Sequence, residues 1–385
     1  MDFHLTKFQQ DIFELVKDVS IKKLNDGNIF EDDDKQAFSR EKWKSCAETD
    51  IFALSLEEQY GGMGESMLTM ALAIQALGRY CNDEGLIFSA CAHFCTCIVP
   101  IWQLGTEFLK EKYLPKLLTG EYIGGNGSTE ADAGSDLSSM ITKVTKDGND
   151  YLLNGSKIFV TNGPIADVLI LYGIHQDGIK LANISGFVVE KGFLGASVGQ
   201  TFHKMGLRTS PLAEIILNDC RIPEENLLGR ERFGIMGFNK SMYWERILMS
   251  AYHLGAMEQQ FNIALDYSKK RKQFNTRIKD FQSVSNKLVE MRANIETSKW
   301  LLYNVCWKYD TGKVDLADAS MVKLVVSNAK VKNSLDAVQI FGAYGYMKEY
   351  LVEKQLRDSI AATIYSGTSE IQKKIISENL ENIDG

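Results

Sequence analysis

The sequence predicts an α+β protein of three consecutive parts: an all-α domain over residues 1–120, a β domain over 121–230 and a helical bundle over 231–385. Apolar residues of the first part recur at the spacing of amphipathic helices. The middle part changes to short apolar or alternating segments separated by turn residues, which is typical of strands. The last part holds long amphipathic runs joined by short loops, which usually form a bundle. A chain of 385 residues is long enough to bury a core in each part.

The composition is that of an ordinary globular protein, and it narrows the class of partner. Hydrophobic residues make up 45% of the chain and charged residues 24%, with a net charge of −7. This negative balance argues against nucleic acid as the main partner. The 7 cysteines lack the spacing of a disulfide framework, and we see no secretory leader. We therefore expect reduced thiols and a cytoplasmic protein.

The all-α domain is predicted from apolar residues at helical spacing, first around Phe8 and Ile12 and again over residues 68–77. Residues 85–105 contain no Asp, Glu, Lys or Arg and have the length of a membrane span. The same segment contains polar residues and Pro100. We therefore interpret it as a buried helix broken at the proline, and we expect no membrane partner.

Cys91, His93, Cys95 and Cys97 alternate along this segment. Their every-second-residue spacing matches no zinc pattern, and a helix would turn the four side chains to different faces. We therefore expect buried structural residues and no metal site.

The β domain is predicted from a hairpin and several apolar strands. Asn154-Gly155 separates two strand-like runs, 151–153 and 157–160, and this dipeptide tolerates the positive φ angles of a tight hairpin turn. Antiparallel strands with such turns suggest a barrel or a sandwich. Further strands are expected at 167–174, 186–190 and 213–217.

The bundle is predicted from three amphipathic runs, over residues 236–269, 281–307 and 315–341. A second turn later in the chain, at residues 366–368, combines two hydroxyls with a glycine before another helical segment. Free N–H groups at such a helix start favour an anion. Taken alone, the pattern also suits a plain joint between helices.

Four motifs near the C-terminus resemble the signature of the acyl-CoA dehydrogenase flavoproteins. They read Gly342-Ala343-Tyr344-Gly345-Tyr346, Glu349-Tyr350-Leu351-Val352-Glu353-Lys354, Arg357-Asp358 and Ile364-Tyr365-Ser366-Gly367-Thr368-Ser369-Glu370-Ile371. The resemblance extends over the whole chain. It implies an N-terminal all-α domain, a middle antiparallel β-barrel or sandwich and a C-terminal four-helix bundle, with borders near 120 and 230. Two departures matter: Leu351 replaces a proline, and Ser366 stands where most members carry the catalytic glutamate.

The resemblance implies FAD as the cofactor. Phe159 would shield the flavin ring and Thr161 would donate a hydrogen bond to it. Arg271 would reach the pyrophosphate in a neighbouring subunit, because a guanidinium matches that group bidentately. This requires a homo-oligomer, and family members are usually tetramers built as dimers of dimers. The implied FAD contacts are Thr129, Gly134, Ser135, Phe159, Thr161, Arg271, Phe274, Gln282, Gln339, Gly342, Thr368 and Glu370.

Oxidising the Cα–Cβ bond of a thioester requires a carboxylate that takes the α-proton while the β-hydrogen leaves as hydride to flavin N5. Ser366 is a poor base. Glu245 lies at a helix position that carries the base in some branches of the family, the isovaleryl-type and long-chain branches among them, so we predict that Glu245 is the base. The alternative is that Glu245 only pairs with Arg246 or another arginine. Ser366, Arg246 and Tyr365 are expected to contact the substrate.

The resulting hypothesis is an FAD-dependent enzyme that desaturates an acyl thioester between its α and β carbons. The thioester is carried by coenzyme A or by an acyl or peptidyl carrier protein of secondary metabolism. A short, branched or cyclic acyl group, prolyl included, is favoured. Electrons pass to an electron-transfer flavoprotein or, in an oxidase, to oxygen. The alternative from another class is a flavin-binding scaffold without turnover.

Overall fold

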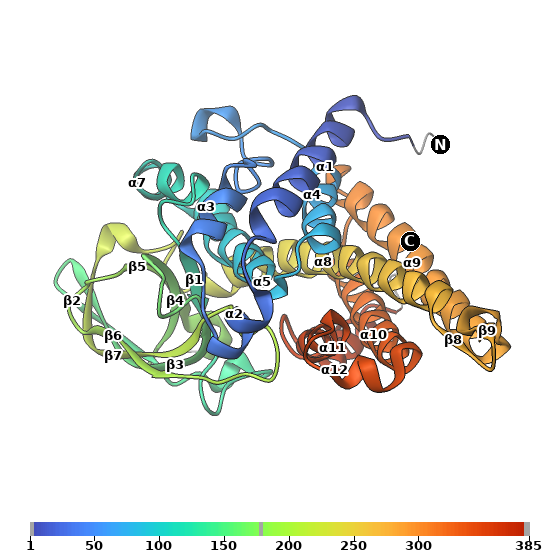
Figure 1. The fold of residues 1–385 in the computed structure, drawn as a ribbon. Coiled ribbons are helices and arrows are strands. Elements are labelled where there is room, and N and C mark those ends of the chain that lie inside the picture. The colour runs from blue at the N-terminus through green and yellow to red at the C-terminus, as the bar shows by residue number, and fades with distance from the viewer. Residues whose placement is uncertain (1–3, 177–179, 381–385) are drawn as a thin grey trace.

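The computed structural model describes residues 4–176 and 180–380, which form a helical, a β and a second helical part in chain order (Figure 1). The sheet lies at one end of the molecule and the C-terminal helices extend to the other, and the N-terminal helices contact both. The predicted fold is therefore confirmed.

Several helices of the N-terminal part begin with a side-chain cap. Thr6, Ser66, Asp83 and Thr106 each accept a hydrogen bond from a backbone N–H of the first turn, as expected for these residue types at a helix start. The elements are α1 Lys7–Val19, η1 Ser20–Leu24, α2 Ile29–Lys35, α3 Arg40–Ala47, η2 Glu58–Tyr60, α4 Met67–Tyr80, α5 Glu84–His93, η3 Phe94–Ile98, α6 Val99–Leu104 and α7 Glu107–Leu118.

The apolar segment Glu84–Leu104 is one continuous helical element made of α5, η3 and α6. It is long and apolar enough to cross a membrane, but 94% of its most hydrophobic window is buried inside the protein. Pro100 lies in the first turn of α6, where its missing N–H is tolerated. The break expected at Pro100 is therefore wrong, because a π-helical stretch (η3) leads directly into α6. The segment is a core helix.

His93 joins this core helix to the sheet. Its Nδ1 accepts a hydrogen bond from the backbone N–H of Gly124 at 2.8 Å, and its Nε2 lies 3.0 Å from the carbonyl oxygen of Leu117. Burial lowers the pKa of His93 to about 3, so the ring is neutral. His93 is therefore a bonded structural residue.

The β domain is one curled, mixed sheet of seven strands within the described residues (Figure 1). Its order is β1-β4-β2-β3-β7-β6, and β5 pairs with β4. Most neighbours are antiparallel as expected, whereas β1 and β2 run parallel to β4. The strands are β1 Gly124–Gly127, β2 Lys143–Asp147, β3 Asp150–Thr161, β4 Val168–His175, β5 Ile184–Glu190, β6 Ala196–Thr201 and β7 Leu212–Pro223, with η4 Leu137–Ser139, η5 Lys180–Asn183 and η6 Glu224–Asn226 between them.

The hairpin predicted at Asn154-Gly155 is wrong. Strand β3 runs unbroken through both residues, and its turn to β2 lies at residues 147–150. Gly155 marks a bulge instead, because the pairing of β3 with β7 shifts register just before it. A Cβ at this position would lie 2.6 Å from Thr142 Oγ1, which explains the glycine.

The C-terminal bundle packs its longest helix, α8, directly against α4. A Cβ on Gly255 would lie 2.0 Å from the carbonyl oxygen of Gln75, and one on Gly78 would lie 2.1 Å from that of Tyr252. The two backbones therefore touch at paired glycines. The elements are α8 Gly234–Lys270, β8 Lys272–Gln273, β9 Thr276–Arg277, η7 Ile278–Asp280, α9 Gln282–Asp310, α10 Leu316–Phe341, η8 Gly342–Tyr346, α11 Leu351–Ala361 and α12 Ser369–Ser377.

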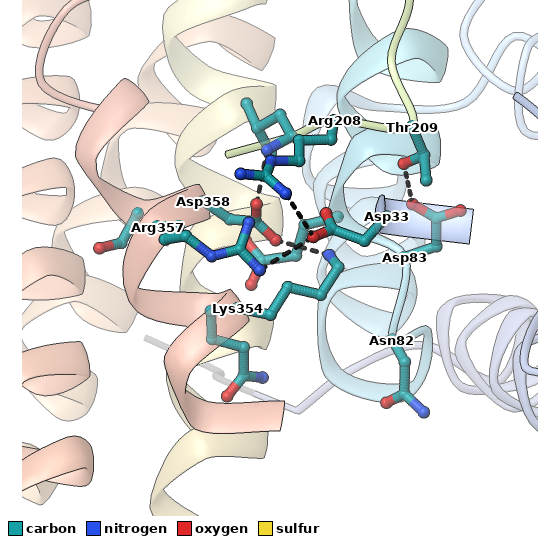
Figure 2. Close-up of polar contacts among 12 residues, drawn as sticks. Asp33, Asn82, Asp83, Arg208, Thr209, Lys354, Arg357 and Asp358 are labelled. Carbon is teal, nitrogen blue, oxygen red and sulfur yellow. Dashed lines mark hydrogen bonds and ion pairs between the residues drawn. The ribbon is translucent and has the colours of Figure 1, made fainter. Parts of the chain in front are cut away.

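A buried cluster of charged side chains joins all three parts (Figure 2). Arg357 on α11 donates a hydrogen bond to Asp33 on α2 at 2.9 Å, and Arg208, in the loop after β6, lies 3.7 Å from the same carboxylate. Also on α11, Lys354 pairs with Asp358 at 2.7 Å. Because α11 leads into the turn before α12, this cluster fixes the position where that turn begins.

Candidate active site

The turn between α11 and α12 is held from three helices. Ser366 and Gly367 have left-handed φ angles of 56° and 87°, which is uncommon for a residue with a side chain. Gln372 of α12 donates to the carbonyl oxygens of both, at 3.0 and 2.8 Å. Lys323 Nζ of α10 donates to the carbonyl of Gly367 at 2.7 Å, and Arg246 Nε of α8 to that of Ser366 at 3.4 Å. The turn is therefore bonded to α8, α10 and α12.

Glu245 lies on α8 with its carboxylate directed at this turn. Its Oε1 accepts a hydrogen bond of 2.7 Å from Ser366 Oγ, and the residue is only 8% exposed. Burial raises the pKa of the Glu245 carboxyl, while the Ser366 hydrogen bond and the charges of Arg246 and Lys323 oppose the rise. A buried carboxylate with a raised pKa has the property that proton abstraction near neutral pH requires.

Arg246, the next residue on α8, donates hydrogen bonds to Ser320 and to the Ser366 carbonyl. Its Nη1 donates to Ser320 Oγ of α10 at 3.2 Å, whereas Glu245 is bonded to Ser366. Burial lowers the pKa of Arg246 to about 10, so the guanidinium stays charged at neutral pH. The site therefore contains a buried cation near the buried carboxylate.

Tyr365 belongs to a buried aromatic group beside the turn. Its hydroxyl lies 2.6 Å from His253 Nε2 and donates to the Tyr252 hydroxyl at 3.3 Å, and its ring packs on Phe88 with centroids 4.7 Å apart. Burial raises the pKa of Tyr365 and lowers that of His253, so both are neutral. Of the three expected substrate contacts, Ser366 and Arg246 thus meet at Glu245 and its turn, and Tyr365 forms an uncharged wall beside them.

Five of the expected FAD contacts lie in the β domain, on β3 or on the loop after β1. Phe159 is 56% exposed with a φ of 55°, and its ring packs on Phe202 with centroids 5.1 Å apart. A Cβ on Gly134 would meet nothing within 4 Å. An exposed aromatic face beside an open loop fits a flat cofactor. The other three residues of this group are Thr129, Ser135 and Thr161.

The loop after β1 is held by a buried ion pair that sequence reasoning missed. Lys157 Nζ of β3 lies 2.5 Å from Glu130 Oε1, and the same carboxylate accepts hydrogen bonds from the N–H groups of Ile141 and Thr142 at 2.7 and 3.0 Å. The sequence signal was a glutamate beside Thr129, but nothing marked Lys157 as its partner.

A second group of expected FAD contacts lies at the other end of the bundle, around the β8–β9 hairpin. Phe274 at this hairpin is 90% exposed. Figure 1 shows the hairpin and the sheet at opposite ends of the molecule. A single chain therefore does not bring the two groups together. The members of this second group are Arg271, Phe274, Gln282, Gln339 and Gly342, all exposed.

Thr368 and Glu370 stand at the start of α12, next to the turn. Thr368 caps the helix by accepting a hydrogen bond from the N–H of Ile371 at 3.4 Å, and Glu370 is exposed in the first turn. These two residues therefore lie near Ser366, and they belong neither to the β-domain group nor to the group around the β8–β9 hairpin.

Residues 6–121, 125–220 and 234–381 match, in order, the N-terminal, middle and C-terminal domains of acyl-CoA dehydrogenase. The chain belongs to the acyl-CoA dehydrogenase family. It is accordingly an oxidoreductase that acts on a CH–CH bond of a thioester, with FAD as its cofactor. The sequence-based predictions of family, enzyme class and cofactor are confirmed.

Relatives named for a carrier-protein substrate and relatives named for a coenzyme A substrate have similar sequence identity to this chain. An L-prolyl-[peptidyl-carrier protein] dehydrogenase from Serratia sp. is 39% identical, covering 99% of this chain and 98% of the relative. A short-chain specific acyl-CoA dehydrogenase from Clostridium acetobutylicum is 36% identical, covering 98% and 99%. Among solved structures, the prolyl acyl carrier protein oxidase AnaB matches with a TM-score of 0.95 and 39% identity, covering 98% of this chain and all of AnaB. A structure described as PigA with FAD and proline matches with a TM-score of 0.96 and 38% identity over both whole chains.

Proposed function

We propose that this enzyme oxidises a prolyl group, or a similarly short cyclic acyl group, held as a thioester on a carrier protein, and that Glu245 is the base. The observation that carries the proposal is the 2.7 Å hydrogen bond from Ser366 to Glu245. The family's usual base position holds a hydroxyl here, and that hydroxyl contacts a buried carboxylate from another helix. Glu245 on α8 would therefore supply the carboxylate base that most family members carry at the position of Ser366.

Two observations support the substrate. Proteins named for a prolyl carrier-protein substrate match this chain end to end, with AnaB as an oxidase and the Serratia protein as a dehydrogenase. In this chain, Phe88 and Tyr252 contact Tyr365, so uncharged aromatic side chains lie beside the candidate base, as an uncharged ring or acyl chain requires. A carrier protein and coenzyme A present the same pantetheine arm, so the test must vary the carrier.

The protein residues have separate roles in this reaction. Glu245 takes the α-proton, which its raised pKa suits. Ser366 orients the carboxylate before reaction, and its backbone N–H would help to polarise the thioester carbonyl. Arg246 keeps its positive charge at neutral pH and favours the negative charge that develops on the substrate. Bound FAD supplies the acceptor for the hydride that leaves the β carbon.

We infer that FAD is held by residues of two subunits. The β-domain group would contact the flavin, with Phe159 against the ring, and Arg271 with its exposed neighbours would hold the pyrophosphate end of the cofactor in a neighbouring subunit. The separation of these groups within one chain supports this arrangement. It requires a homo-oligomer, and a dimer of dimers is expected. Light scattering that gave a monomer with full FAD would contradict it.

The substrate is tested by anaerobic bleaching of the bound flavin with four thioesters: prolyl and butyryl groups, each on a carrier protein and on coenzyme A. We expect the prolyl carrier protein to bleach the flavin fastest. Bleaching by the coenzyme A esters alone would contradict the carrier assignment, and bleaching by butyryl alone would contradict the cyclic acyl group.

The electron acceptor is tested on the same bleached enzyme. Admission of air would restore the flavin colour within the turnover time of an oxidase, whereas a dehydrogenase would need an electron-transfer flavoprotein. Return in air would assign an oxidase, and return only with the electron-transfer flavoprotein would assign a dehydrogenase; relatives named for each are equally similar to this chain.

A further inference from the structure

Lys323 is a buried cation to which the reaction described so far assigns no role. It lies on α10, is 2% exposed, and donates its hydrogen bond of 2.7 Å to the backbone carbonyl of Gly367 rather than to a carboxylate. Moving an ammonium group out of water is costly unless nearby groups compensate. A buried ammonium group at this position therefore needs nearby negative charge or dipoles to stabilise it.

The charged groups that face Lys323 come from two neighbouring helices. From α8 they are Glu245 and Arg246, and from α12 the exposed carboxylate Glu370. His253, also on α8, is neutral because burial lowers its pKa. The positive charge of Lys323 lowers that pKa further. Two buried cations, Lys323 and Arg246, thus accompany one buried carboxylate, Glu245, so the site has a surplus of positive charge.

We propose that Lys323 is a positioning residue for proton abstraction: it ties the 365–368 turn to α10, so that the Ser366 hydroxyl meets Glu245, and its charge keeps Glu245 ionised. This inference rests on the proposed role of Glu245 as the base. Within the described residues, no hydrogen bond or ion pair joins Lys323 to Glu245. Lys323 acts by its hydrogen bond to the backbone of the turn and by the electrostatic effect of its charge on Glu245.

The reaction then has a defined pH dependence. Burial first, and then repulsion by Arg246, lower the pKa of Lys323 to about 8, while Glu245 and Glu370 oppose the shift. The ammonium form is therefore present below about pH 8 and is lost above it. Loss of the charge weakens the bond to the Gly367 carbonyl, so the turn holds the Ser366 hydroxyl less firmly on Glu245. Flavin reduction should then fall on the alkaline side of about pH 8.

The experiment compares Lys323→Met and Lys323→Arg with Lys332→Met, which removes an exposed lysine of the same helix. The first readout is the carboxylic acid carbonyl stretch of Glu245 in the FAD-loaded enzyme, followed by infrared difference spectroscopy across pH. It is identified by its absence in Glu245→Gln. The second readout is the pH profile of flavin bleaching by the thioester that reacts fastest in the panel.

We expect Lys323→Met to raise the pH at which Glu245 ionises by about one unit and to abolish the decline near pH 8. Lys323→Arg should keep the wild-type Glu245 titration and move the decline to higher pH, because arginine stays charged. Lys332→Met should change neither readout. If Lys323→Met fails to bind FAD, the pH profile of flavin bleaching in Lys323→Arg decides alone. A decline that stays near pH 8 in Lys323→Arg would overturn the proposal.

A wild-type Glu245 titration in folded Lys323→Met would also overturn it. Failure of the underlying function looks different: Glu245→Gln would then still bleach its flavin, whatever the lysine variants do.

Discussion

Ser366 and Glu245 are 121 positions apart in the chain, yet the hydroxyl of one donates a hydrogen bond of 2.7 Å to the carboxylate of the other. The contact joins α8 to the turn before α12. It exists because the turn is bonded to α8, α10 and α12, and because α11, which leads into it, is fixed by the buried charge cluster of Figure 2. The proposed base and its hydrogen-bond donor are thus positioned by different sets of contacts.

Removal of the Ser366 hydroxyl should raise the pKa of Glu245, because the bond favours the ionised carboxylate. In Ser366→Ala, the acid limb of flavin reduction should move to higher pH by about one unit. Ser366→Gly should show the same displacement but unfold at a higher temperature than Ser366→Ala, since glycine accepts the φ of 56° without strain. Identical acid limbs in both variants and the wild type would contradict the role given to the hydroxyl.

Glu245→Gln should stabilise the protein at neutral pH. The folded-state pKa of Glu245 is raised, so the stability that its protonated form contributes is fully present below the unfolded pKa and is lost as pH rises through the folded pKa. Glutamine keeps the neutral form at every pH. Thermal unfolding of the two proteins should therefore coincide at low pH and diverge above it, and a less stable variant at neutral pH would contradict the raised pKa.

Lys354→Met should destabilise the charge cluster of Figure 2. It would leave Asp358, which is fully buried, without the ammonium that lies 2.7 Å away. Breaking a buried pair in this way costs about 3–5 kcal/mol. The matched control is Lys22→Met, which removes an exposed pair with Asp18 and should leave stability nearly unchanged. Equal unfolding midpoints in denaturant for the two variants would refute a stabilising role for the cluster.

Gly255→Ala should separate α8 from α4, because the added methyl would lie 2.0 Å from the carbonyl oxygen of Gln75. Overpacking of this kind costs about 1–3 kcal/mol or more. The comparison is Gly134→Ala, where the methyl meets nothing within 4 Å. In FAD-free protein, only Gly255→Ala should lower the melting temperature. With FAD added, Gly134→Ala should show weaker binding if the loop after β1 holds the cofactor as proposed.

Local sequence signals predicted the helices and the three-part order, but not every turn. Asn154-Gly155 has the chemistry of a hairpin turn, yet the long pairing of β3 with β7 keeps the strand continuous and converts the glycine into a bulge. The parallel pairing of β1 with β4 joins strands that are distant in the chain, so no local pattern reveals it.

The candidate site shows the same division between local and tertiary information. The motif around Ser366 and the glutamate on α8 were visible in the sequence, whereas their hydrogen bond depends on helix packing. Lys323 was missed because a lysine in an amphipathic helix usually faces water, and only the structure shows that it is buried.

The most direct test of Glu245 as the base is single-turnover, anaerobic bleaching of the flavin in Glu245→Gln and in the wild type, with the prolyl carrier-protein thioester as substrate. We expect the variant to bind FAD to the same stoichiometry and to bleach about 10²–10⁴ times more slowly, which is the contribution expected of a general base. A variant that bleaches at a rate close to that of the wild type would show that another group takes the α-proton and would contradict the central claim.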